Sequence, residues 1–177
     1  MATPEGLFPN TLISAEVKAS FPKGYTVRAL ERTDFSKGFL DCLRVLTWVG
    51  DLTEEQFHER YDEMNTQGKG TYFLIVIEYE GRIVGTGSLI AEKKFIHDRG
   101  ICGHIEEVSI AKDQQGKKLG QKMLAALDSV AINLGCYKTI LDCGPEKEPF
   151  YVKCKYHNSG CEMSHYHEEW KDAYHRG

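Results

Sequence analysis

The sequence predicts an α/β domain (an α+β arrangement) with a mixed, mostly antiparallel central sheet flanked by helices. The 177 residues, 41% of them hydrophobic and 27% charged, are enough for one domain with a sizeable core. Strand-like and helix-like segments follow one another in the order β-α-α-β-β-β-α-β-α-β. A hairpin signal, Glu80-Gly81, joins two apolar runs in the middle of the chain and predicts antiparallel neighbours there.

The first third of the chain predicts one strand and two helices. Residues 1–22 carry three prolines and no sustained periodicity, which indicates a tail or arm. Tyr25–Leu30 alternates as a strand does, and apolar residues recur over 35–46 on one helical face. Thr53-Glu-Glu-Gln56 is a capping box and predicts the start of a second helix.

Three strands are predicted next. Two of them, residues 71–79 and 82–90, are the arms of the hairpin, and His104–Ala111 is the third. In this third strand the apolar residue before the two glutamates, Ile105, has an odd number, whereas those after them, Val108 and Ile110, have even numbers, so the parity of the apolar positions switches across Glu106 and Glu107. A β-bulge produces such a switch, and bulges are frequent beside active sites.

The last third alternates helices and strands. Residues 117–134 form the strongest helical pattern, and Gly135 supplies its stop. A strand over 137–143, a short helix over about 145–156 and a last strand over 160–166 follow. Residues 168–177 are polar and predict a C-terminal tail.

The net charge and the apolar runs of the sequence indicate which kinds of binding partner and location to expect. The formal net charge of −4 and the pI of about 6.0 give no global basic field, which disfavours a nucleic-acid or anionic-membrane binder. The N-terminus lacks a basic-then-apolar signal pattern and no apolar run reaches the length of a membrane span, so a cytoplasmic location is expected. The six cysteines are then expected to be reduced thiols.

One cysteine pattern offers zinc-type ligands. Cys154, His157, Cys161 and His165 form C-x2-H-x3-C-x3-H. The order does not match the usual finger or knuckle arrangements. Buried thiols and exposed histidines are therefore the favoured interpretation, and no metal is expected.

A strand, a glycine turn and a long helix carry the strongest chemical signal. The turn, Gln115-Gly-Lys-Lys-Leu-Gly120, places two glycines and two lysines before a helix N-terminus. Free N–H groups and the helix dipole favour an anion at such a position. The spacing is not that of a Walker loop, and a solvated basic loop is the alternative interpretation.

This turn resembles the acetyl-CoA loop of the GNAT N-acetyltransferase superfamily, Q/R-x-x-G-x-G/A. Gln115 and Gly120 match it, while Lys118 replaces the central glycine. Four further segments resemble the glucosamine 6-phosphate N-acetyltransferase family, namely Lys94–His97, His104–Val108, Gly135–Cys143 and Phe150–Cys154. The resemblance extends from about Tyr25 to Met163.

The resemblance implies a GNAT acyltransferase domain over residues 23–167. It implies acetyl transfer from acetyl-CoA to the 2-amino group of D-glucosamine 6-phosphate, within UDP-N-acetylglucosamine synthesis. It also implies a homodimer with shared active sites. No cysteine is flanked by a nearby base in the sequence, so direct attack in a ternary complex is expected rather than an acyl-enzyme.

The resemblance also assigns residue roles. The catalytic residues would be Tyr151, which donates a hydrogen bond or proton to the thiolate, Glu106, Glu107 and Asp142. Acetyl-CoA would be bound by Val108, Ser109, Ile110, Gln115, Gly116, Lys117, Lys118, Leu119, Gly120, Tyr151 and Lys153. The amino sugar would contact Thr47, Lys94, Phe95, Ile96, His97, Glu106, Glu107, Val108 and, from the neighbouring subunit, Tyr137 and Lys138.

Three departures from the family pattern are visible. Glu106-Glu107 stands where Glu-Asp is frequent. Lys147-Glu-Pro149 replaces an Asn-Val whose asparagine commonly contacts the pantetheine, and Ser164–His167 replaces a basic ending. The pantetheine contact and any C-terminal phosphate contact therefore lack their usual residues.

The residues themselves leave alternatives open. Glu106 and Glu107 point to opposite faces of a regular strand, so without a bulge only one of them meets the amine. Tyr151 could be a core aromatic beside Phe150, and Lys138 a solvated charge. Two other functions stay open: a GNAT enzyme acting on another primary amine, such as a protein N-terminus or a polyamine, and a non-catalytic zinc-stabilised binding module.

Overall fold

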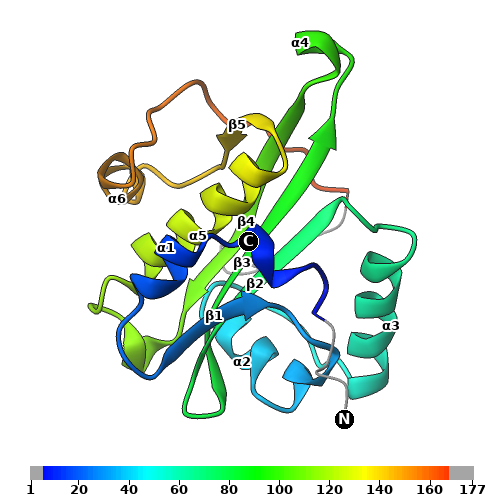
Figure 1. Cartoon of the computed structure of the whole chain (residues 1–177), viewed down its shortest axis with the longest axis vertical. Helices are drawn as coiled ribbons and strands as arrows, with labels where there is room; N and C mark the ends of the chain where they lie inside the picture. Colours follow the sequence, from blue (N-terminus) through cyan, green and yellow to red (C-terminus); the bar gives the residue numbers. More distant parts are fainter. Residues whose placement is uncertain (1–5, 168–177) are drawn as a thin grey trace.

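Five strands form a single sheet in the order β1-β2-β3-β4-β5 (Figure 1). The computed structural model describes residues 6–167. The strands are β1 Tyr25–Ala29, β2 Tyr72–Tyr79, β3 Arg82–Lys93, β4 Ile101–Ile110 and β5 Cys136–Ile140. The pairs β1–β2, β2–β3 and β3–β4 are antiparallel, and β5 runs parallel to β4. The predicted mixed, mostly antiparallel sheet is confirmed.

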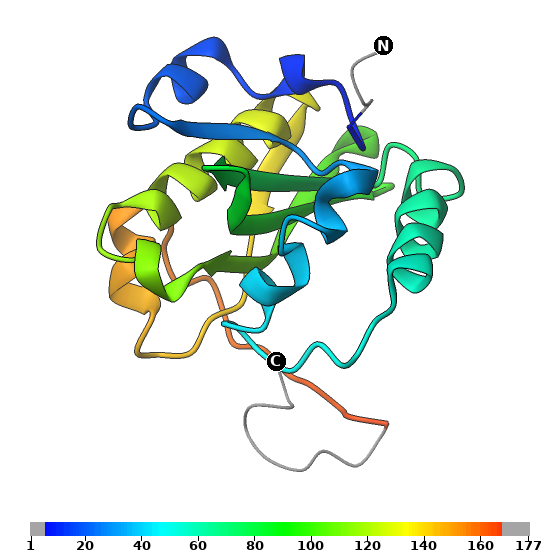
Figure 2. The same ribbon diagram turned by 90° about the horizontal axis from the view of Figure 1, so that it is seen from below.

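Helices cover both faces of this sheet (Figure 2). They are α1 Ala15–Ala19, α2 Phe39–Leu43, α3 Glu54–Asn65, α4 Ile96–Arg99, α5 Leu119–Asn133 and α6 Glu148–Lys153, with 3-10 turns η1 Asn10–Leu12, η2 Arg32–Phe35 and η3 Lys112–Gln114. On one face α5 packs so closely that a Cβ at Gly87 would lie 2.9 Å from Leu127 Cδ1. On the other face α2 lies against β4, where Ser109 Oγ donates to the Cys42 carbonyl at 2.7 Å.

Local signals set two helix boundaries. The capping box at the start of α3 is present: Gln56 N donates to Thr53 Oγ1 at 3.2 Å, and Thr53 N donates to Gln56 Oε1 at 2.9 Å. The single helix expected over 35–46 is divided into η2 and α2. Gly38 lies between them at φ 82°, a left-handed conformation that a helix interior does not accommodate.

The N-terminal segment expected as a tail or arm lies against the body of the domain. Leu7, Phe8, Ile13 and Phe21 are buried in the core. Ser14 N donates to Ser129 Oγ of α5 at 2.9 Å. Short irregular segments bury single apolar residues without a helix or strand period, so periodicity alone could not reveal this packing.

The predicted last strand is wrong. Residues 160–166 are irregular, and β5 is the outermost strand on its side of the sheet. An alternating pattern reports which side chains share a face, but it does not tell whether the backbone meets a partner strand, and residues 160–166 do not pair with the open edge of β5. The tail expected over 168–177 lies outside the described residues. Among residues 6–167, no helix is long and apolar enough to cross a membrane.

Candidate active site

A β-bulge interrupts β4 at the two adjacent glutamates. Ser88 of β3 pairs with Glu106, and the register then shifts, so that Gly87 faces both Glu107 and Val108. Glu107 adopts φ 56°, in the left-handed region. The bulge predicted from the parity switch is therefore confirmed, and it lies in the middle of the strand rather than at its end.

The bulge places both carboxylates on the sheet face that α2 covers. Glu106 lies directly across from Ser88, and directly paired residues share a face. Ser88 Oγ donates to Glu107 Oε2 at 2.9 Å, so the second glutamate turns to the same side. Two adjacent residues of a regular strand could not do this.

Glu107 borders a cavity of about 290 Å³ between α2, α3 and the sheet. Thr47, a predicted sugar contact, lines the same cavity. Aromatic and basic side chains that the sequence analysis did not single out also line it, namely Trp48, Phe57, Arg60 and Tyr61. No short motif connects these residues, because α2, α3 and the loop between them bring them together only in the fold.

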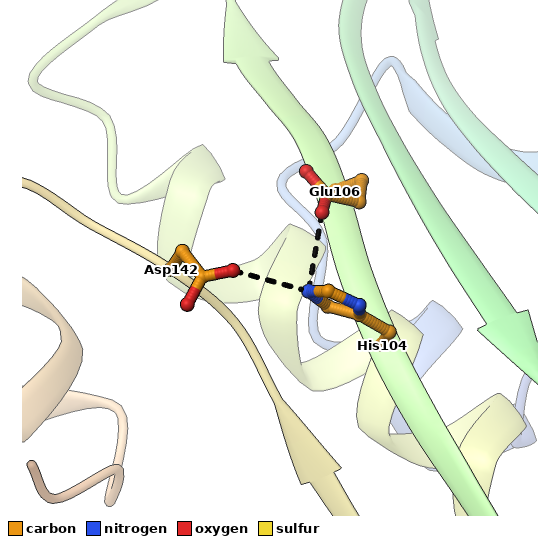
Figure 3. A group of neighbouring side chains, drawn as sticks. All are labelled: His104, Glu106 and Asp142. Carbon is orange, nitrogen blue, oxygen red and sulfur yellow. Dashed lines mark ion pairs between the residues drawn. The ribbon is translucent and has the colours of Figure 1, made fainter. Parts of the chain in front are cut away.

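Glu106 belongs to a second group of side chains, shown in Figure 3. His104 Nε2 lies 3.1 Å from Glu106 Oε1 and 3.4 Å from Asp142 Oδ2. His104 and Glu106 are two residues apart on β4 and so share a face, while Asp142 comes from the loop after β5. The structure therefore brings two of the predicted catalytic carboxylates together around one histidine.

Burial raises the pKa of Glu106, and the charges of Asp142, Glu107 and Glu162 raise it further, while His104 lowers it. A carboxyl group whose pKa is raised toward neutrality is a better proton acceptor near neutral pH than an ordinary glutamate. This electrostatic setting is typical of a general base.

The described residues contain one group of metal-ligand type, and it is not the cysteine–histidine pattern. Side-chain atoms of His104, Glu106 and Asp142 lie within 4.8 Å of one another. Cys154 ends α6, and His157, Cys161 and His165 are exposed along an irregular segment without gathering. The zinc-stabilised module therefore has no assembled site within residues 6–167.

Beyond the first residues of β4, no strand covers its outer edge. β5 pairs only with Ile101–His104, so the edge from Ile105 to Ile110 has no strand partner among the described residues. Tyr151 of α6 is half-buried, and the charge of Glu106 is one of the causes that raise the pKa of Tyr151. Burial is the largest cause that raises the pKa of Tyr151, so its hydroxyl stays protonated over ordinary assay pH.

Three contacts fix α6 in this position. Phe150 packs on Gly120 at the start of α5, where a Cβ would lie 3.2 Å from Phe150 Cζ. Tyr156, just after the helix, donates to Asp128 Oδ1 of α5 at 2.7 Å. Tyr156 N also donates to the Tyr151 carbonyl at 3.1 Å. The glycine that ends the loop motif thus allows close packing of the helix that carries Tyr151.

The loop before α5 fits a phosphate group. Gly116 has φ 79° and Lys118 has φ 61°, which turns the chain into the helix. The N-cap residue Lys118 makes no side-chain cap on α5, so within residues 6–167 the first N–H groups of the helix are free to meet an anion. Gln115 Nε2 donates to the Ile110 carbonyl at 3.1 Å and ties the loop to β4. Lys118 adopts a left-handed backbone conformation, which glycine adopts most easily. This explains why a glycine usually occupies the centre of the motif.

Two predicted acetyl-CoA ligands have other partners in the structure. Lys117 Nζ lies 2.7 Å from Gln114 Oε1 and 3.2 Å from the Tyr25 hydroxyl, so its charge is held on the side of β1. The Ser109 side chain is buried and bonded to Cys42, which leaves only its backbone for a ligand. Lys153 lines a separate cavity of about 530 Å³ between α1, α5 and the end of α6.

The remaining predicted sugar contacts lie at the far end of the sheet. Phe95 and Ile96, at the tip between β3 and β4, are 98% and 63% exposed. The His97 ring lies 4.3 Å from that of Tyr137, and Lys138 Nζ lies 5.8 Å from the same Tyr137 ring. Five residues of β4 separate this end from Glu106, roughly 17 Å at 3.4 Å per residue. One chain therefore does not bring these residues to Thr47 and Glu107.

The fold and site define the class as an acetyltransferase with a GNAT fold, and residues 28–156 match the acetyltransferase (GNAT) family. The family takes its acetyl group from acetyl-CoA. The chain is 44% identical over 142 residues to the glucosamine 6-phosphate N-acetyltransferase of Candida albicans, which covers 80% of this chain and 95% of that protein. It is 41% identical over 144 residues to the Arabidopsis thaliana enzyme of the same name, covering 80% and 96%. The crystal structure of glucosamine-6-phosphate N-acetyltransferase from Arabidopsis thaliana superposes with a TM-score of 0.78 at 40% identity, covering 81% of this chain and 99% of that one. The chain belongs to the glucosamine 6-phosphate N-acetyltransferase family.

Proposed function

We propose that the protein transfers acetyl from acetyl-CoA to the 2-amino group of D-glucosamine 6-phosphate by direct attack in a ternary complex. The products are N-acetyl-D-glucosamine 6-phosphate, for UDP-N-acetylglucosamine synthesis, and CoA. The observation that carries the proposal is the approach of Glu106 and Asp142 to His104 at the point where β4 and β5 separate, on the strand whose outer edge is open. The relatives named for this amino sugar support the choice of substrate.

The proton balance assigns different roles to the carboxylates and the tyrosine. The amine must be neutral to attack, so Glu106 accepts its proton, either directly or through water. A C–N bond then forms and the C–S bond of the thioester breaks. Tyr151 donates the proton that the leaving thiolate takes up. The nitrogen loses its second proton as the amide forms, and this proton returns Tyr151 to its neutral form, while the proton on Glu106 passes to solvent. Burial keeps the pKa of Tyr151 high, so the donor form is the one present.

The negative charge on the carbonyl oxygen needs a donor in the transition state. A bulge leaves a residue of its strand outside the ladder pairing, so its N–H group is available to a ligand. The Glu107–Val108 bulge directly follows Glu106 and lies within the open edge of β4. A backbone N–H of this bulge is our candidate for the oxyanion donor.

Acetyl-CoA would be bound through backbone groups at two places. The open edge of β4 over Val108–Ile110 offers N–H and C=O groups to the pantetheine amides. The uncapped start of α5, after Gln115–Gly120, offers N–H groups to the pyrophosphate. Because neither place depends on the asparagine that is missing near Pro149, the site keeps its main contacts.

We also propose that the working unit is a homodimer with shared sites. Phe95, Ile96 and Tyr137 expose apolar surface far along the sheet from Glu106. A second subunit that covers this surface would bring Lys138 and its neighbours to the sugar phosphate of the other site. Sedimentation of the purified chain should give twice the chain mass of 20.1 kDa. Lys138→Ala should raise the KM for the sugar phosphate and leave that for acetyl-CoA unchanged; an unchanged sugar KM contradicts the shared site.

A CoA-release assay with three amines tests the reaction. Glucosamine 6-phosphate, glucosamine and a short peptide should be compared at equal concentration with saturating acetyl-CoA. We expect turnover with the sugar phosphate, much weaker turnover with glucosamine, and none with the peptide. A preference for the peptide, or for a polyamine tested in the same way, would establish the alternative of a GNAT enzyme with another amine substrate.

A further inference from the structure

We propose that His104 is a positioning residue that holds the Glu106 and Asp142 carboxylates together at the separation of β4 and β5. The proposal rests on the proposed function. It concerns a residue that the sequence analysis placed only within a family segment, without a role.

The histidine lies between acidic groups from three parts of the chain. Its Nε2 faces Glu106 and Asp142 at 3.1 and 3.4 Å, and its Nδ1 lies 3.6 Å from Glu92 Oε1 of β3. Lys94 pairs with the other oxygen of Glu92. The hydrogen bond from Lys94 is the largest cause that lowers the pKa of Glu92, so this carboxylate stays ionised. Lys94 and Glu92 thereby fix the orientation of the ring from the side away from the reacting amine.

Two carboxylates that come from different elements repel each other unless a donor lies between them. Within residues 6–167, the ion-pair contacts of Glu106 and Asp142 are with His104. Glu106 is anchored in β4, but Asp142 belongs to an irregular segment and its side chain is 49% exposed. The ring nitrogen is thus the group that keeps the carboxylate of the irregular segment beside the carboxylate of the strand.

His104 Nε2 is shielded from solvent, yet neither oxygen meets it at a hydrogen-bonding angle. Catalytic hydrogen bonds in a site without substrate are commonly long or poorly aligned, and they tighten when substrate binds. His104 then acts through the Glu106 and Asp142 carboxylates and does not contact the reacting atoms.

The test compares His104→Ala, His104→Gln, Asp142→Asn and the double variant His104→Ala/Asp142→Asn. Glutamine carries a donor N–H₂ near the position of Nε2, whereas alanine removes it. We expect His104→Ala to lower kcat about 10²-fold, since misplacement by about 1 Å can have that effect. The KM for acetyl-CoA should not change, because the loop before α5 does not touch His104. His104→Gln should recover a large part of kcat.

The double variant tests whether the two residues act as one unit. If His104 works through Asp142, the double variant should be no slower than the slower of the two single variants. His157→Ala, at an exposed position after α6, is the matched control and should have wild-type kinetics. Thermal melts and CoA titrations verify that each variant is folded and binds CoA.

Several results would overturn the proposal. Full kcat in His104→Ala, multiplicative losses in the double variant, or a glutamine variant as slow as alanine each exclude a positioning role. Loss of wild-type activity on dialysis against EDTA, with recovery on adding Zn²⁺, would mean that the three residues hold a metal instead. A wild-type chain that is inactive on every amine would refute the proposed function itself. An active wild-type chain with an equally active His104→Ala variant would refute only the role of His104.

Discussion

Tyr156→Phe tests how the packing of α6 sets the position of Tyr151. The substitution removes one hydroxyl and leaves the ring, so it deletes the 2.7 Å bond to Asp128 Oδ1 and the 3.1 Å contact with Thr139 Oγ1. A hydrogen bond to a charged group contributes about 1.5–3 kcal/mol. Asp128 keeps its bond from Thr139 at 2.9 Å, so we expect the free energy of unfolding to fall by about 2 kcal/mol. For a chain of this length, that lowers Tm by roughly 4–8 °C.

Thermal melts and kcat of Tyr156→Phe should be measured beside Tyr72→Phe. Tyr72 is the matched control, because its hydroxyl has no hydrogen-bond partner among residues 6–167. We expect kcat of Tyr156→Phe to fall less than tenfold, since the backbone bond from Tyr156 to Tyr151 remains. A Tm equal to that of Tyr72→Phe would refute the argument that this hydroxyl anchors α6 to α5.

Three further predictions concern the site itself. The kcat/KM of the wild-type chain should fall on the acid side at a pH above 4.5, the ordinary glutamate pKa, because burial raises the pKa of Glu106 and its protonated form cannot accept the amine proton. Glu106→Gln should lower the plateau of this profile about 10²–10⁴-fold, and a pH–rate profile of both proteins checks it. Tyr151→Phe should lower kcat at saturating acetyl-CoA about 10²-fold or more, and stopped assays of CoA release that give wild-type turnover would exclude proton donation by Tyr151. Gly116→Ala should raise the KM for acetyl-CoA several-fold and leave the KM for the amine unchanged. A Cβ there meets nothing within 4 Å, so the change acts only by straining a φ of 79°, about 1–3 kcal/mol.

The parts of the fold that depend on neighbouring residues could be predicted from the sequence. The capping box at Thr53 and the hairpin turn at Glu80-Gly81 are local signals, and both features are present. The bulge at Glu107 also left a local trace, because it changes which residues of one strand face the core. Each of these signals spans a few consecutive residues, and the local structure that it predicts depends mainly on the same few residues.

Features that depend on distant partners could not be predicted in this way. The alternating residues 160–166 suit a strand, but whether their backbone approaches a partner strand is decided elsewhere in the fold. His104 shares the strand period of Glu106, which was the available signal for its place on that face. Its approach to Asp142 depends on where the chain leaves β5, and no spacing in the sequence contains that information.

The net charge of the protein likewise does not predict where a phosphate group binds. A chain with net charge −4 must bind two phosphorylated ligands under our proposal, and for CoA the sequence predicts free N–H groups, a helix dipole and two lysines in the loop before α5. The ammonium of Lys117 is instead held by Gln114 and Tyr25. The uncapped start of α5 carries about half a unit of positive charge on its free N–H groups. Because this charge belongs to the backbone, it does not appear in any count of basic residues. An acidic composition therefore excludes a broad cationic surface without excluding a phosphate site, and Gly116, which sets the backbone direction, should affect acetyl-CoA binding more than Lys117.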